Sequence, residues 1–442
     1  MGRSDSESSA SSDNEKSHDE QDETLKNDVV TTKYNVAAEI CNNALKASYH
    51  FPNQISLIAI NFQEVLAAVK DGAEVAVLCD LGDKFITEKV KTIFKKEGLA
   101  KGIAMPTCIS VDNCICHFSP LRSDTPVYLK DGQLVKVDLG CHIDGYIATA
   151  AHTVVVGATK DNKVKGDAAK LLRATYEAME IAIRMLRPET KNMEITAAID
   201  KTASEYGVTP IENMLSHQLA RNQIDGEKQI IQNPGEKQRG EMEKVAIDKY
   251  EAYAIDILFS NGKGKAKDQN TRTTIFKKND EEVYSLKMKA SRIFFSECQK
   301  EHGSMPFTLR SFEDEVKAKM GVLECEKHGL LKPYQVLYEN AGDLVVQFKS
   351  TVLVMPNGLL KITGIPLDYS LLGTDAKLKD PALIATLSTS LKPKNKKKKK
   401  AKTDGNAAAA PPAADAKAAP PPAAKAEEKK ESKDKGKAKG KA

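Results

Sequence analysis

Residues 134–156 read LVKVDLGCHIDGYIATAAHTVVV, and this stretch decides the fold. Two apolar runs rich in β-branched residues flank Asp144 and Gly145. That dipeptide favours the type I′ turn of a two-residue hairpin loop. The sequence therefore predicts an antiparallel β-hairpin here.

The register of this hairpin determines which side chains share a face. If residues 143 and 146 flank the turn, Asp138 lies opposite residue 151 on the other strand. Thr149 is two residues from 151, so we expect it on the same sheet face as Asp138. A strand aspartate whose diagonal neighbour is a second carboxylate would be half of a metal site, but here the neighbour is a threonine.

The remaining sequence mixes helical and strand patterns. Apolar residues at helical spacing predict helices at 31–45, 81–96, 164–187, 193–206, 281–302 and 311–329. Apolar β-branched runs predict strands at 252–260, 344–348 and 351–355. Between them, residues 270–340 are expected to form a strongly charged helical insertion.

Residues 47–63 interrupt the first helical pattern. They read ASYHFPNQISLIAINFQ, which combines a proline with a β-branched apolar run. If they are left out, Val65, Leu66 and Val69 continue the apolar stripe that contains Ile40. The segment is either a genuine loop or an unspliced or wrongly assigned stretch of coding sequence, and the sequence alone leaves both interpretations open.

The two ends of the chain differ in charge from the part between them. Residues 391–442 hold 17 Lys against 6 acidic residues, a balance of +11, so the total of +5 leaves −6 for residues 1–390. Residues 1–24 hold 8 acidic residues and many serines. We expect a disordered acidic leader at 1–28, a folded domain at 29–388 and a disordered Lys/Ala/Pro-rich tail at 389–442.

The sequence offers no signal for membrane insertion or secretion. It has no run of about 18 apolar residues, and its acidic N-terminus does not resemble a signal peptide. We therefore expect an intracellular protein with no membrane insertion, whose eight scattered cysteines are reduced and buried.

The hairpin segment KVDLGCHIDGYIATAAHTV resembles the metal-binding hairpin of the type 2 methionine aminopeptidases. In that family each strand carries one aspartate. Asp138 matches the first aspartate, and Thr149 replaces the second. The resemblance implies an α+β fold of the pita-bread (creatinase/aminopeptidase) type, with a helical insertion and disordered termini.

Other motifs of that family follow in the same order. His117 in NCICHF matches a substrate-site histidine, and His217 in MLSHQLA matches a metal-binding histidine. Asp225 in IDGEK replaces a second substrate-site histidine. Asp256 in YAID replaces a glutamate ligand, and Lys349 in QFKS replaces the glutamate that bridges the two metal ions.

These substitutions predict the loss of the metal site. A pair of divalent ions needs anionic oxygens and neutral imidazoles as ligands. Lys349 brings a like charge, and unit charges about 4 Å apart interact by roughly 4 kcal/mol at an effective dielectric of about 20. Without a metal no water is activated for hydrolysis. We expect no metal, no cofactor and no peptidase activity, with Lys349 paired to Asp138 or Asp256.

Three longer segments indicate a more specific family. MLSHQLARNQIDGEKQIIQNP, MPFTLRSFEDE and LVVQFKSTVLVMPNG resemble the proliferation-associated 2G4 (ErbB-receptor-binding) family, and the likeness spans about 29–380 except 47–63. The resemblance implies an inactive protein that binds rRNA and other structured RNA, the large ribosomal subunit, and receptor or transcription-repressor proteins. It also implies roles in ribosome biogenesis, translation and growth or transcription regulation, in the cytoplasm, nucleus and nucleolus.

Lysine and arginine side chains are the candidates for RNA contact. They would bind the phosphate backbone, which gives salt-dependent affinity but no sequence information. The candidates are Lys263, Lys265, Lys267, Lys287, Lys289 and Arg292 in the domain, and Lys394, Lys396, Lys397, Lys398, Lys399 and Lys400 in the tail.

Three other classes compete with this hypothesis. A metal-dependent methionine aminopeptidase could use a degraded site of Asp138, His217 and Asp256, since three ligands suffice for some zinc enzymes. A duplex-DNA regulator would need a groove-reading motif, and none is present. The run GKGK at 262–265 lacks the spacing of a phosphate-binding P-loop, which disfavours a nucleotide site.

Overall fold

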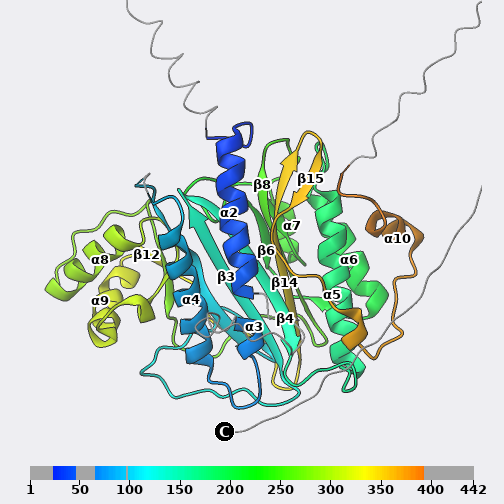
Figure 1. Cartoon of the computed structure of the whole chain (residues 1–442), viewed down its shortest axis with the longest axis horizontal. Helices are drawn as coiled ribbons and strands as arrows, with labels where there is room; N and C mark the ends of the chain where they lie inside the picture. Colours follow the sequence, from blue (N-terminus) through cyan, green and yellow to red (C-terminus); the bar gives the residue numbers. More distant parts are fainter. Residues whose placement is uncertain (1–22, 46–64, 96–97, 393–442) are drawn as a thin grey trace, which may run out of the picture. The chain divides into compact units, whose positions relative to one another are not determined.

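The computed structural model describes residues 23–45, 65–95 and 98–392. The expectations for 47–63, for residues 1–22 of the leader and for the tail lysines from Lys394 onward lie outside these described residues. Within them, a nine-stranded antiparallel sheet forms the centre of the fold (Figure 1). Its main path runs through β1 (Lys101–Val111), β3 (Leu134–Ile143), β4 (Tyr146–Val155), β14 (Val345–Met355), β8 (Ala252–Ser260), β6 (Leu215–Leu219) and β7 (Gln229–Ile231).

The predicted hairpin is confirmed in its position and register. β3 pairs antiparallel with β4, Ile143 faces Tyr146, and Asp138 faces Ala151. The turn residues Asp144 and Gly145 have φ angles of 54° and 79°. Both angles are positive, as a type I′ turn requires.

Four helices cover one face of the sheet (Figure 1). α2 (Asp28–Leu45) and α4 (Val75–Thr92) pack on β1, β3 and β4. α5 (Gly166–Met185) packs on β8 and β14, and α6 (Asn192–Tyr206) packs against α5. The apolar cores contain alternate strand residues, such as Val137 and Leu139 of β3 and Ile255 and Ile257 of β8. Because strand side chains alternate, Asp138 and Asp256 point to the opposite face.

The charged insertion is partly helical and partly a small sheet, so the expectation of a helical segment was incomplete. It contains α8 (Lys289–Glu301) and α9 (Glu315–Lys327), which lie at the left of Figure 1, and the small sheet of β10 (Ile275–Lys278), β11 (Phe307–Thr308) and β12 (Leu331–Pro333). Helix α8 begins eight residues later than predicted. The reason is that the Glu324 carboxylate accepts the backbone N–H groups of Lys287 and Met288 and so fixes the start.

Three further boundaries differ from the prediction. The expected strands 344–348 and 351–355 are one strand, β14, because Lys349 and Ser350 pair within the sheet instead of breaking it. The leader ends earlier than 28, since Leu25 is buried in the core. The folded part also extends past 388, where Leu391 follows α10 (Pro381–Leu387) and packs on the core.

The ends of the undescribed segment 46–64 lie close together. Helix α3 (Val65–Ala68) contacts α2 and lies near its C-terminal end in Figure 1. Val65 and Leu66 are buried in the same core cluster as Ala44 and Leu45. The apolar stripe predicted to continue across this segment is therefore continuous in space.

The cysteine side chains lie in the interior, as the sequence predicted. All eight cysteines are buried and unbridged. None of the helices in the described ranges has both the length and the apolar composition that a transmembrane span requires.

Candidate functional site

The candidate site is a row of side chains across four neighbouring strands. In the sheet register, Asp138 of β3 faces Ala151 of β4, Ala151 faces Lys349 of β14, and Lys349 faces Asp256 of β8. His217 of β6 faces Ala254, two residues before Asp256. The sheet therefore brings together positions that lie far apart along the chain.

The Lys349 ammonium lies between the two carboxylates. Its Nζ is 2.7 Å from Asp138 Oδ2 and 3.0 Å from Asp256 Oδ2. Residue 151, between Asp138 and Lys349, is an alanine, and its small side chain leaves room for this contact. The sequence predicted a pair with one carboxylate or the other, whereas the structure shows both at once.

All three charged side chains are buried, with exposed fractions of 4% for Asp138 and 9% each for Asp256 and Lys349. Burial lowers the pKa of Lys349, but the two carboxylates outweigh burial and raise it above its ordinary value. The ammonium is therefore protonated at neutral pH.

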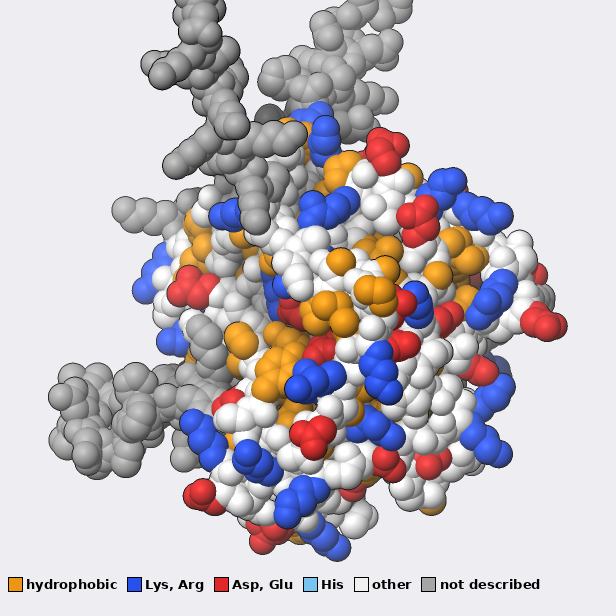
Figure 2. Space-filling view, turned by 90° about the vertical axis from the view of Figure 1, so that its right-hand side faces the viewer, with side chains coloured by type: hydrophobic (Ala, Val, Ile, Leu, Met, Phe, Trp, Pro, Cys, Tyr) orange, Lys and Arg blue, Asp and Glu red, His pale blue; other side chains and the backbone are white. Residues whose placement is uncertain are grey.

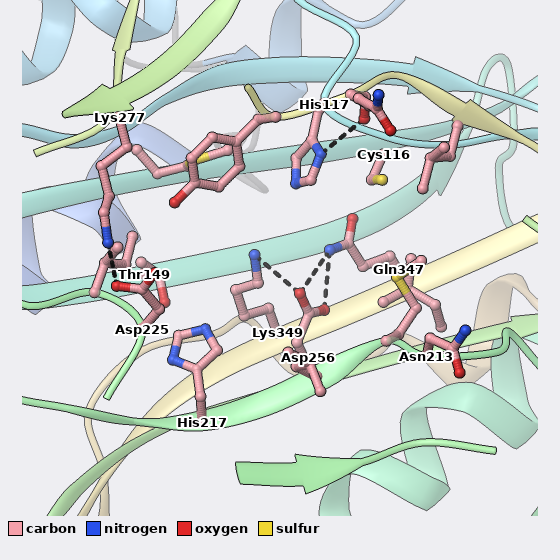
Figure 3. Close-up of a pocket in the computed structure, with 18 of the residues that line it drawn as sticks. Cys116, His117, Thr149, Asn213, His217, Asp225, Asp256, Lys277, Gln347 and Lys349 are labelled. Carbon is pink, nitrogen blue, oxygen red and sulfur yellow. Dashed lines mark hydrogen bonds and ion pairs between the residues drawn. The ribbon is translucent and has the colours of Figure 1, made fainter. Parts of the chain in front are cut away.

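Asp256 has an additional partner that was not predicted from the sequence. Gln347 Nε2 lies 2.9 and 3.1 Å from the two carboxylate oxygens of Asp256 (Figure 3). Burial raises the pKa of Asp256 to about 6, although the Lys349 charge acts in the opposite direction. Two carboxylates share one ammonium, which leaves one excess negative charge in the fully ionised site.

A cavity of about 440 Å³ opens over this row. Both histidines of the predicted substrate and metal site line it, together with Thr149 and Asp225. His117 Nδ1 contacts the Gln335 carbonyl at 3.1 Å, and His217 Nδ1 contacts the carbonyl of the next residue at 3.2 Å. Burial lowers the pKa of both rings, that of His217 to about 4, so both are neutral at pH 7.

Asp225 lies at the edge of this cavity and forms an ion pair with Lys277 of the insertion (Figure 3). Tyr334, also from the insertion, packs edge-on against His117 with ring centroids 5.1 Å apart. The insertion therefore forms one wall of the cavity. No site residue was predicted on that wall.

The residues present do not fit a pair of divalent metal ions. The position between Asp138 and Asp256 is taken by the Lys349 ammonium, which has no lone pair to donate. Thr149 contributes no anion, and its buried Oγ1 has no hydrogen-bond partner in the described part of the chain. Asp138 Oδ1 also has no partner there. These side chains therefore form an internal ion-pair network and do not provide a ligand set for two metal ions.

The basic candidates within the domain lie on two separate elements. Lys263, Lys265 and Lys267 are exposed near β9 (Lys267–Asp268), where Lys265 also pairs with Glu212 at 2.7 Å. The others, Lys287, Lys289 and Arg292, are exposed at the start of α8. Arg292 donates to the backbone carbonyls of residues 286 and 287.

The GKGK loop has an internal function that the sequence did not reveal. The buried Glu339 carboxylate accepts the backbone N–H groups of Lys263, Gly264 and Lys265 at 2.7 to 3.1 Å. Gly264 has a φ angle of 71°, which favours glycine. The loop therefore resembles an anion-binding nest whose donors are used by a side chain of the same protein.

The raised pKa of Asp256 leads to a pH-dependent prediction. A carboxylate with a pKa of about 6 in the fold and about 3.9 when unfolded makes stability fall as pH rises between these values. Two pKa units correspond to about 3 kcal/mol. We expect Asp256→Asn to remove this loss. The melting temperature of the variant minus that of the wild type should therefore increase as pH is raised from 4 to 7. Parallel melting profiles over this range would contradict it.

Comparison with known proteins agrees with this geometry. The family model described as "Metallopeptidase family M24" matches residues 54–259. Proliferation-associated protein A of Dictyostelium discoideum is 41% identical over 375 residues, which cover 85% of this chain and 92% of that protein. ErbB-3 binding protein 1 of Arabidopsis thaliana is 41% identical over 387 residues, covering 87% and 91%. A solved structure of a thermophilic Arx1 matches with a TM-score of 0.74 at 29% identity, covering 83% of this chain and 99% of that chain.

The fold and the row of strand side chains define a protein of the peptidase M24 class, with the pita-bread fold that the resemblance to the type 2 methionine aminopeptidases implied. Within that class the identity to the two relatives is high and extends over most of their length. The chain belongs to the proliferation-associated 2G4 (ErbB-receptor-binding) family.

Proposed function

We propose that this protein is a non-catalytic aminopeptidase-like protein that binds RNA and the large ribosomal subunit. In this proposal it acts in ribosome biogenesis, translation and growth or transcription regulation, in the cytoplasm, nucleus and nucleolus. The observation that carries the non-catalytic part is the Lys349 ammonium between Asp138 and Asp256. Hydrolysis by this class needs a metal-activated water, and an ammonium cannot replace the metal in that step.

The surface supports electrostatic RNA binding at particular places. On the face that carries α6 and α10, Lys and Arg side chains are interspersed with Asp and Glu (Figure 2). That face offers no continuous cationic surface for a phosphate backbone. The exposed lysines beside β9 and at the start of α8, together with the lysine-rich tail sequence, are the better candidates.

The insertion also exposes apolar side chains. Val316, Met320 and Leu323 of α9 are 60%, 56% and 62% exposed, and Ile293 of α8 is 57% exposed. The three α9 residues follow helical spacing and so form one stripe. Exposed apolar stripes of this kind are typical of interaction surfaces, which supports protein contacts beside the RNA contacts of α8.

Ribosome co-sedimentation at graded salt tests the proposal. We expect the full chain to pellet with large subunits at about 50 mM salt. A tail making about six phosphate contacts should lose roughly a thousandfold in affinity by about 200 mM. Deletion of residues 393–442, which keeps Leu391 in place on the core, should flatten this salt dependence. The double variant Lys287→Ala, Lys289→Ala should weaken the remaining binding. The control is Glu313→Ala, which removes an acidic side chain elsewhere on the insertion. If association depends neither on the salt concentration nor on the deletion, the tail does not bind the ribosome electrostatically.

A further inference from the structure

A second cavity, which we call the rear cavity, lies on the helix-covered face of the sheet, opposite the candidate site. It has a volume of about 510 Å³, within the range of small-molecule pockets. β4 forms its floor through residues 152–155, and α5 contributes Leu172. Leu66 of α3 and the segment 365–372 complete the wall. The same strand therefore faces the ion-pair row through Thr149 and the rear cavity through His152.

The lining of the rear cavity is mostly apolar, with polar surface in the minority. It includes Val154, Val164, Leu172, Ile365, Leu367 and Leu372. Among the described residues that line it, Asp368 alone is charged, and its carboxylate accepts the N–H and the hydroxyl of Ser370. The described lining contains no lysine or arginine.

His152 is the exception in this apolar lining. Its side chain is 7% exposed, and its ring packs edge-on against Phe348 with centroids 5.0 Å apart. Neither ring nitrogen makes a hydrogen bond to any residue that the structure describes. Burial, with a smaller contribution from Lys361, lowers the pKa of His152 to about 4, so the ring is neutral at pH 7. A neutral imidazole has one N–H donor and one acceptor nitrogen to satisfy.

The ring nitrogens of His152 are not closed off from the cavity, so a molecule bound there can reach them. The hydroxyl of Thr153, the next residue, donates a hydrogen bond to the Gln347 backbone carbonyl at 2.6 Å. His117 and His217 also have backbone partners. Of the three histidines that line the two cavities, His152 alone presents an unused donor and acceptor to the described surroundings.

We propose that the rear cavity binds a small uncharged apolar molecule with one hydroxyl or carbonyl group, which hydrogen-bonds to His152. The apolar walls would hold the hydrocarbon part. An anionic head group is disfavoured, because the described lining offers no cation and Asp368 would repel it. A cationic head group could pair only with Asp368, whose Oδ1 already accepts both hydrogen bonds from Ser370, and the remaining lining cannot solvate a charge, so a cation is disfavoured as well.

The test uses three probes with the same ten-carbon chain: 1-decanol, decanoate and decylammonium. Each is titrated at pH 7 into the full-length protein, 1-decanol below its aqueous solubility and the two charged probes below their micelle concentrations. Binding is followed by ligand-observed NMR. We expect 1-decanol to bind at least about tenfold more tightly than either charged homologue, because burial of an unpaired charge costs more than one hydrogen bond returns. Equal affinity for all three probes, or no binding of 1-decanol, would overturn the proposal.

Two variants and a control locate the site. His152→Phe replaces one ring by another of similar size, so it should keep the protein folded, and it should weaken 1-decanol binding roughly tenfold. Ala158→Phe, which places a large ring at the edge of the cavity, should abolish binding. His217→Phe, on the opposite face of the sheet, should leave it unchanged. If 1-decanol binds both cavity variants as well as it binds the wild type, the rear cavity is not the site. Loss in Ala158→Phe alone would refute the assignment to His152.

Discussion

Replacing Lys349 with methionine should lower the free energy of unfolding at pH 8 by about 3–5 kcal/mol, the usual cost of removing one partner of a buried ion pair. Methionine is similar in length and fills the same space. It leaves Asp138 and Asp256 as two buried carboxylates with no cation between them. Mutual repulsion and desolvation raise the pKa of both groups in the variant. The loss should therefore shrink as pH falls and the carboxylates take up protons.

Denaturant unfolding of matched variants measures this effect. Lys265→Met is the control, since its ion pair with Glu212 lies on the surface, and it should cost no more than about 1 kcal/mol. The triple variant Asp138→Asn, Asp256→Asn, Lys349→Met removes all three charges and should recover much of the stability. A Lys349→Met protein within about 1 kcal/mol of the wild type at pH 8 would show that the ammonium does not hold the site together.

The double variant Thr149→Asp, Lys349→Glu should bind Co²⁺ or Mn²⁺ with micromolar affinity. It removes the competing ammonium and adds two carboxylates on the sheet face that already carries Asp138, Asp256 and His217. His217 is neutral, as a metal ligand must be. Asp138 Oδ1 has no partner among the described residues, so one ligand oxygen is available from the start.

Electron paramagnetic resonance of added Mn²⁺ reports this binding, because bound ions leave the free-ion signal. The single variant Thr149→Asp keeps Lys349 and should bind far more weakly, which separates the missing anion from the added cation. Adding His217→Ala to the double variant should weaken binding again. If the double variant leaves the free Mn²⁺ signal unchanged, substitution of ligands does not explain the loss of the site.

Much of this site could be predicted from the sequence because it lies on regular strands. The turn dipeptide Asp144-Gly145 determines the hairpin register, and that register alone places Thr149 on the face of Asp138. Gln347 could be found by the same rule. It lies two residues before Lys349 on β14, hence on the same face.

Contacts between distant segments could not be predicted in this way. The pairing of Asp225 with Lys277 and the packing of Tyr334 on His117 depend on how the insertion closes over the sheet. No local pattern encodes that arrangement.

Two of the misplaced boundaries have the same kind of cause. Helix α8 starts where Glu324, which lies far along the chain on α9, accepts the backbone N–H groups of Lys287 and Met288. Strand β14 was predicted as two strands separated by Lys349 and Ser350. Here the partners of Lys349 come from β3 and β8, so the strand continues through it.

Isothermal titration of the wild-type protein with Co²⁺ or Mn²⁺ at pH 7.5 tests whether the Lys349 ammonium has taken the place of a metal ion between Asp138 and Asp256. We predict no binding tighter than millimolar, and the same result for Asp138→Asn. Micromolar binding by the wild type that is lost in Asp138→Asn would contradict the account, because it would show that a metal ion displaces Lys349 from between the two carboxylates.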